Sequence, residues 1–128
     1  MYLFDIGLLG CMLELPAQAI IEQNFGSTKG YLAENFVATE LLAAFDNNLL
    51  AWSERTAEIE FITSQFGNIV PIEVKSSNKT RAKSLKVFLQ KYSPKHAIKL
   101  STNPPEFNNK QALQHMPLYL SGHIDMIL

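Results

Sequence analysis

The sequence predicts an α/β domain built on a mixed sheet of about four to five strands flanked by helices. Three observations support this fold class: an amphipathic helical segment, three strand-like segments joined by short links, and a second helix followed by another strand. Short links favour antiparallel neighbours, whereas a strand, a helix and a strand in succession favour a parallel crossover. The expected core order is therefore helix, three strands, helix, strand (α-β-β-β-α-β).

The size and composition of the chain indicate one globular domain over residues 1–128. Apolar residues make up 47% and charged residues 18% of the sequence, which excludes a disordered or fibrous class. No apolar run is long enough for a membrane span and no basic leader is present, so we expect a cytoplasmic protein without a membrane partner. Cys11 is the only cysteine, which excludes an intramolecular disulfide, and we expect it to be buried.

The first helix is predicted over residues 28–45, with Thr28 as its cap and apolar residues at helical spacing. Before it, YLFDI at residues 2–6 is strand-like and breaks at Gly7. A chain that opens directly into apolar, core-like sequence suggests the C-terminal fragment of a longer protein.

Three strands are predicted over residues 49–53, 57–64 and 68–75, with short turns that make the meander antiparallel. Pro71 disfavours a central ladder position, so the third strand is expected to begin beside an edge or a bulge. A lysine-rich helix over residues 80–92 should then lead by a right-handed crossover to a strand at 96–101. A loop at 102–112 and a packed apolar tail complete the chain.

The segment AEIEF carries two acidic side chains at alternate positions of the second strand. Because side chains alternate between the faces of a strand, Ile59 and Phe61 should share one face, and Glu58 and Glu60 the other. Glu58 is expected to face solvent or to pair with Arg55.

The segment PIEVK repeats this pattern on the third strand, where Ile72 and Val74 should oppose Glu73 and Lys75. Two carboxylates and an ammonium on neighbouring strands suit a hard divalent cation and a phosphate. Glu60, Glu73 and Lys75 are therefore candidate residues for the hydrolysis of a phosphodiester.

The net charge of −1 conceals a strong asymmetry between two parts of the chain. Residues 1–74 have ten acidic and two basic residues, whereas residues 75–99 have eight basic residues and no acidic one. The basic block either pairs with the acidic half of the fold or attracts a polyanion. A track for the DNA backbone would use Lys79, Arg81, Lys83 and Lys86.

The order of these elements, with Glu34 on the first helix, Glu60 on the second strand and Glu73-x-Lys75 on the third, resembles the PD-(D/E)XK, or restriction-endonuclease-like, superfamily. More closely, the chain is similar to the uncharacterised domains that follow AAA+ type ATPase modules in bacterial and archaeal proteins. The similarity extends from residue 2 to about residue 120. The matching pieces are YLFDIGLL, KGYLAENFVATELL, EIEFI, IVPIEVKSS, SLKVFLQKY and MPLYL.

This resemblance implies a metal-dependent DNA nuclease. Glu34, Glu60 and Glu73, with the main-chain carbonyl of Val74, would hold Mg²⁺ or Mn²⁺, and Lys75 would orient water and offset charge in the transition state. It also implies an upstream ATPase module as a partner. The chain itself has no G-x-x-x-x-G-K-[ST] motif, so we expect no ATP site, and homo-oligomers are compatible with the sequence.

Several features favour the alternative of a catalytically inactive, nuclease-like module for DNA or protein recognition. The superfamily usually has Asp where this chain has Glu60, and a solvated strand face would explain Glu73 and Lys75 without a metal. Glu34 would then simply favour the N-terminus of its helix. His96, His115 and His123 have no metal-binding spacing and are interpreted as structural.

Overall fold

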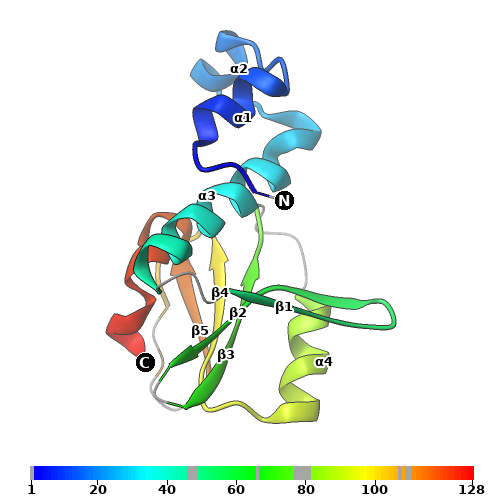
Figure 1. The fold of residues 1–128 in the computed structure, drawn as a ribbon, viewed down its shortest axis with the longest axis vertical. Coiled ribbons are helices and arrows are strands. Elements are labelled where there is room, and N and C mark those ends of the chain that lie inside the picture. The colour runs from blue at the N-terminus through cyan, green and yellow to red at the C-terminus, as the bar shows by residue number, and fades with distance from the viewer. Residues whose placement is uncertain (1, 46–48, 66, 77–81, 107, 109–110) are drawn as a thin grey trace.

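A computed structural model of the chain describes residues 2–45, 49–65, 67–76, 82–106, 108 and 111–128. Five strands form one sheet in the order β1-β2-β3-β4-β5, with helices on both faces (Figure 1). The strands are β1 (Leu50–Glu54), β2 (Ala57–Gln65), β3 (Asn68–Val74), β4 (Ala97–Ser101) and β5 (Leu113–Pro117). The helices are α1 (Ile6–Met12), α2 (Ala17–Ile21), η1 (Gly26–Thr28), α3 (Lys29–Ala44), α4 (Lys83–Tyr92) and η2 (Leu118–Ile127). The predicted α/β class and element order are confirmed.

The sheet is antiparallel over β1, β2 and β3 and parallel over β3, β4 and β5. The antiparallel meander and the parallel relation of β3 to β4 therefore agree with the sequence prediction. Pro71 pairs with Ile62 of β2 and lies one residue before the pairing with β4 begins at Ile72. Because β3 has no partner on the β4 side at this residue, the missing N–H of Pro71 leaves no hydrogen bond of the sheet unmade.

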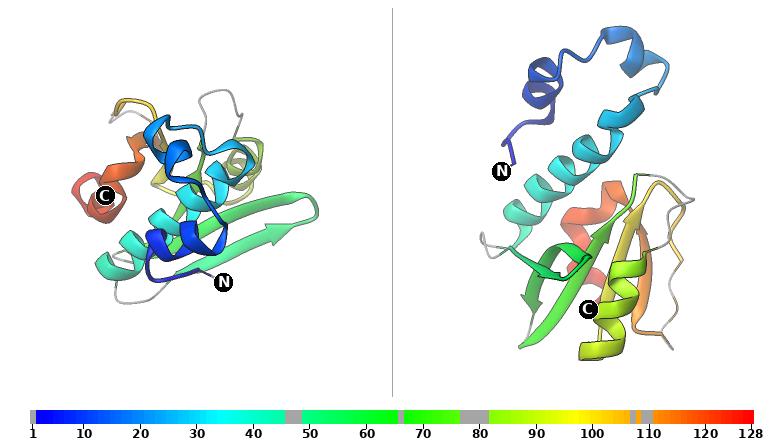
Figure 2. Two further views of the ribbon diagram at one scale, coloured as in Figure 1. Left: turned by 90° about the horizontal axis from the view of Figure 1, so that it is seen from above. Right: turned by 90° about the vertical axis from the view of Figure 1, so that its right-hand side faces the viewer.

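The sheet separates the apolar core into two layers, one on each of its faces. α3 and η2 cover one face of the sheet and α4 covers the other (Figure 2). Val37 and Leu41 of α3 pack with β-strand residues such as Ile72, whereas Leu85 and Phe88 of α4 pack on the opposite face. Trp52 of β1 lies edge-on to Phe88 and extends this second layer.

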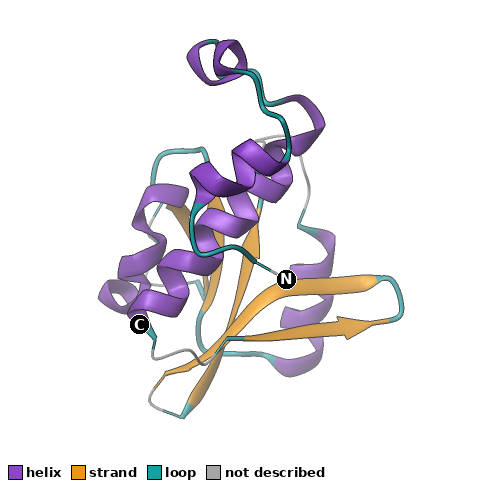
Figure 3. Cartoon of the chain, turned by 45° about the horizontal axis from the view of Figure 1, so that its top comes forward, coloured by secondary structure: helices purple, strands orange, loops and turns teal. Residues whose placement is uncertain are grey.

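A bulge in β2 makes the predicted alternation of that strand wrong. The pairing with β1 changes from Leu50↔Ile62 to Trp52↔Ile59, so Glu60 and Phe61 together lie opposite Ala51. Ile59 belongs to the α4 layer, whereas Phe61 belongs to the α3 layer. Phe61 and Ile59 therefore do not share a face, and the β1/β2 hairpin bends away from the rest of the sheet (Figure 3).

The N-terminal segment is also different from the prediction, since residues 2–5 form no strand and α1 includes Gly7. Asp5 begins this helix by accepting a hydrogen bond from the N–H of Leu8 at 2.7 Å. Neither α1 nor α2 has a buried residue, and both extend beyond the sheet as an arm (Figure 1). Cys11, which was expected to be buried, is exposed in this arm.

The two main helices begin and end close to the predicted residues. Thr28 precedes α3, but its hydroxyl donates to the carbonyl of Phe25 instead of capping the helix. α4 ends at Tyr92, and Ser93 takes a left-handed conformation just before Pro94. The predicted start of the second helix, at residues 80 and 81, lies outside the described residues. Within the described ranges, no helix has the length and apolar character needed to cross a membrane.

Candidate active site

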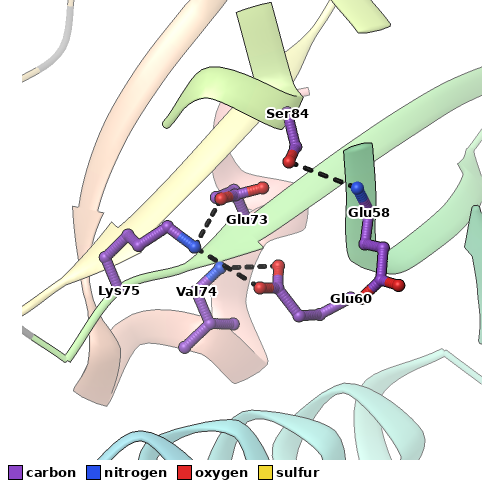
Figure 4. Close-up of polar contacts among 6 residues, drawn as sticks. All are labelled: Glu58, Glu60, Glu73, Val74, Lys75 and Ser84. Carbon is purple, nitrogen blue, oxygen red and sulfur yellow. Dashed lines mark hydrogen bonds and ion pairs between the residues drawn. The ribbon is translucent and has the colours of Figure 1, made fainter. Parts of the chain in front are cut away.

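Three of the four predicted site residues meet at the C-terminal end of β3 (Figure 4). The Lys75 Nζ atom lies 2.5 Å from Glu73 Oε1 and 3.4 Å from Glu60 Oε1. The ammonium therefore joins the carboxylates of two neighbouring strands. This is the cluster that the acidic patterns in β2 and β3 predicted.

Glu60 makes a second contact that depends on the bulge. Its Oε2 atom accepts a hydrogen bond from the N–H of Val74 at 3.3 Å. The pairing of β2 with β3 ends at Phe61↔Ile72. Just beyond this end, the Glu60 carboxylate accepts from the N–H of Val74, where the hydrogen bonds between the two strands stop. Glu60 therefore links β2 to the end of β3 and also contacts Lys75.

Glu73 is the most deeply buried charged residue of the cluster, with 2% of its surface exposed. Its Oε1 atom contacts Lys75, whereas its buried Oε2 atom has no hydrogen-bond partner among the described residues. Burial raises the pKa of Glu73 above its usual value, although the hydrogen bond from Lys75 opposes the shift. A buried carboxylate oxygen without a partner is costly unless a ligand or water binds it.

Lys75 remains a cation in this environment. Burial alone would lower its pKa, but the hydrogen bond to Glu73 and the charge of Glu60 outweigh that effect, and the pKa is raised. The side chain is 18% exposed, so its ammonium is accessible from one side. A positive charge held beside two carboxylates can stabilise negative charge that develops on a substrate.

Glu34, the fourth predicted residue, approaches the cluster from α3. It is partly buried, and its pKa is raised by burial and by the negative charge of Glu60, with an opposing effect from Lys75. The first turn of α3 has no acidic residue, so the interpretation of Glu34 as a stabiliser of the helix N-terminus is not supported. Glu34 acts on the site through its charge and forms no hydrogen bond or ion pair with the other described residues.

Tyr2 belongs to the same region, which sequence reasoning did not predict. The buried Asn35 side chain accepts a hydrogen bond from the N–H of Leu3 at 2.7 Å and donates one to its carbonyl at 2.9 Å. This places the Tyr2 ring 5.4 Å from that of Phe61. Burial raises the pKa of the Tyr2 phenol, and the charges of Glu34 and Glu60 raise it further. The only sequence signal for this contact was one amide in the apolar stripe of α3.

The carboxylates of the cluster do not form a ready-made metal site. In the part of the chain that the structure describes, no group of three or more His, Cys, Asp or Glu side chains is arranged to hold a metal ion. Glu60 and Glu73 instead share the ammonium of Lys75.

The predicted basic track is described only in part. Lys83 and Lys86 are exposed on α4, whereas Lys79 and Arg81 lie outside the described residues. Lys91, on the same helix, forms an ion pair with Glu54. Among the described residues, Lys83 and Lys86 form no ion pair, whereas Lys91 of the same helix does.

A comparison with known protein families places part of the chain in one of them. Residues 29–119 match the model of DUF4143, a domain of unknown function. The chain belongs to the DUF4143 family. This DUF4143 region includes Glu34, Glu60, Glu73 and Lys75, but excludes Tyr2 and the arm. No curated protein and no solved structure shows a significant match to the chain.

Proposed function

We propose that this DUF4143 domain is a metal-dependent phosphodiesterase of the DNA nuclease-like, PD-(D/E)XK type. The observation that carries the proposal is the contact of Lys75 with both Glu60 and Glu73, beside a buried carboxylate oxygen that has no hydrogen-bond partner among the described residues. This combination provides acidic ligands, a cation and an unsatisfied oxygen within one short stretch of sheet.

The residues present fit a divalent cation that keeps most of its water ligands. Mg²⁺ commonly takes one or two protein carboxylates, and Glu73 Oε2, which has no hydrogen-bond partner among the described residues, is an oxygen of the kind it prefers. Glu60 and Glu73 would hold Mg²⁺ or Mn²⁺, with Glu34 adding negative charge from α3. When bound, such an ion supplies a Lewis acid and an activated water.

The chain itself contributes charge and positioning. Lys75 keeps its proton and stabilises the extra negative charge that develops on the phosphorus oxygens. Glu60 ties β2 to Val74 and so fixes the distance between the two acidic strands. Glu34 adds to the negative potential that would attract a cation.

The test is cleavage of supercoiled and linear DNA by the purified protein in Mn²⁺. The wild type should cleave, and Lys75→Ala and Glu73→Gln should each lose activity. Glu58→Gln is the matched control, because Glu58 lies on the same strand as Glu60 and is exposed. Circular dichroism of each variant checks that it folds. Absence of cleavage, or equal cleavage by all variants, would reject the proposal.

A second candidate function, docking on another protein, is favoured by the N-terminal arm. α1 and α2 have no buried residues; Ile21 of α2 exposes 75% of its surface, and Phe4, just before α1, exposes 86%. A pocket of about 440 Å³, lined by residues such as Cys11, Phe25 and Phe36, lies between the arm and α3. Exposed apolar patches of this kind are typical of protein interaction sites.

The partner that the resemblance implies is an ATPase module. The proposal also includes a cytoplasmic location. Binding of a separately purified ATPase module, measured by calorimetry, should be lost in Phe4→Ser/Ile21→Ser and retained in Lys75→Ala. Equal binding by both variants would reject docking through the arm.

A further inference from the structure

A row of polar side chains crosses the parallel part of the sheet next to the candidate active site. Glu73 of β3 is paired with Lys99 of β4, and Lys99 is paired with His115 of β5. Directly paired residues of neighbouring strands point to the same face, and the strands lie about 4.8 Å apart. Lys99 therefore stands between the buried acid and the imidazole. The exposed Glu106, which forms an antiparallel bridge with His115, ends the row on the other side.

This row lies on the α4 face, beyond the apolar residues that α4 covers. Ala97 and Leu113, two residues before Lys99 and His115 respectively, belong to the cluster packed under α4. Side chains alternate along a strand, so Lys99 and His115 share that face and lie nearer the C-terminal ends of β4 and β5. The carboxyl ends of parallel strands are where α/β sheets bind ligands.

Among the described residues, no carboxylate forms an ion pair with Lys99. Lys75 takes Glu73 Oε1, although Lys99 is close enough to lower the pKa of Glu73. Lys99 and His115 are both partly buried, yet retain access to solvent. A partly desolvated ammonium without a counterion is stabilised by an anionic ligand.

We infer that Lys99 and His115 form a phosphate subsite, which binds a backbone phosphate of a nucleic acid beside the group held at Glu60, Glu73 and Lys75. The inference rests on the proposed function for the identity of the substrate, but the subsite requires neither metal nor catalysis. Lys99 supplies the charge, and the imidazole of His115 can donate a hydrogen bond to a phosphate oxygen.

The experiment measures binding of a short DNA duplex in EDTA as a function of KCl concentration. The wild type is compared with Lys99→Gln and His115→Gln. Lys95→Gln is the control, because Lys95 is exposed two residues before β4 begins and belongs to the same basic block. Lys99→Gln should weaken binding and reduce the slope of log K against log salt by about one, more than Lys95→Gln does. His115→Gln should weaken binding at every salt concentration.

Inorganic phosphate added to the same assay tests whether the subsite prefers a polymer. Competition only at concentrations far above that of DNA phosphate supports a nucleic-acid subsite, whereas equal competition per phosphate would overturn that assignment. If Lys99 merely neutralises Glu73, Lys99→Gln will lower stability at neutral pH and leave the salt slope unchanged, which would also overturn it.

The outcome is separable from that of the proposed function. A protein that binds DNA through Lys99 but never cleaves it contradicts the nuclease proposal alone. A protein that cleaves DNA with an unchanged salt slope in Lys99→Gln contradicts the phosphate subsite alone.

Discussion

Asn35 holds the main chain of Leu3 at both of its polar groups, by one hydrogen bond that it accepts and one that it donates. This contact joins α3 to a segment more than thirty residues earlier and brings Tyr2 onto Phe61, near Glu34 and Glu60. The N-terminal residues are thereby part of the surroundings of the candidate active site.

Replacing Asn35 by Ala should release residues 2–5 from α3. Two hydrogen bonds to a partly buried main chain are lost, so we expect the free energy of unfolding to fall by about 1–3 kcal/mol. Urea unfolding gives the stability, and hydrogen exchange of Leu3 reports the local release. Asn24→Ala is the control, since Asn24 is exposed. Unchanged exchange at Leu3 would show that the contact does not hold the segment.

Removing the ammonium of Lys75 should destabilise the fold, because the buried Glu73 carboxylate loses its ion pair. We expect Lys75→Met to lower the free energy of unfolding at pH 7 by about 1–3 kcal/mol, less than for a fully buried pair because Lys75 is partly accessible. The loss should shrink as pH falls and Glu73 takes up a proton. In Lys75→Met/Glu73→Gln, most of the stability should return. A single variant as stable as the wild type would contradict this.

Glu34 should make the fold less stable as the pH rises. Burial and the charge of Glu60 raise its pKa above the ordinary value of 4.5. A carboxyl with a raised pKa in the folded state stabilises the fold below its unfolded pKa, and this contribution is lost as the pH rises through the folded pKa. Urea unfolding from pH 4 to 8 should therefore show a smaller decline in Glu34→Gln than in the wild type. Glu58→Gln should follow the wild-type curve.

The length of Glu60 should matter as much as its charge. Glu60→Asp withdraws the carboxylate from Val74 and Lys75, and we expect a loss of about 1 kcal/mol in stability. Glu60→Gln keeps the reach but removes the charge, and it should lower Mn²⁺ affinity more than it lowers stability. Calorimetry and unfolding give the two quantities. An Asp variant that is more stable and binds Mn²⁺ more tightly would contradict this view of the site.

The exposed lysines of α4 should contribute to DNA binding unequally. Lys83→Gln/Lys86→Gln should reduce the salt slope by up to about two, because both side chains are exposed. Lys91→Gln should change it less, since Lys91 already pairs with Glu54. Equal effects from all three lysines would indicate diffuse attraction rather than a track.

The elements and the cluster at β3 could be predicted because they depend on local patterns. The apolar periodicity of α3 and the alternation in β3 lie within single segments, and the alternation in β3 places Glu73 between the core residues Ile72 and Val74. The meeting of Glu60 with Lys75 then follows from the antiparallel pairing of adjacent strands.

The remaining features depend on contacts between distant segments. The bulge at Glu60 and Phe61 is set by the register of β2 on β1, and the place of Tyr2 is set by Asn35. The strand-like interpretation of residues 2–6 was wrong, and α1 was not predicted, because the apolar residues before Gly7 outweighed the capping signal of Asp5. Neither Lys99 nor His115 stands out in the sequence, since only the parallel register aligns them with Glu73.

The bulge in β2 also constrains how this domain can change during evolution. Deletion of one residue there would restore strict alternation and turn either Glu60 or Phe61 to the opposite face. Glu60 could then no longer contact the site while its neighbour Phe61 packs in the core. Point substitutions at Glu60 alter the chemistry of the cluster, but insertions or deletions in β2 would dismantle its geometry. The spacing along this strand is therefore as much a part of the site as the side chains that it carries.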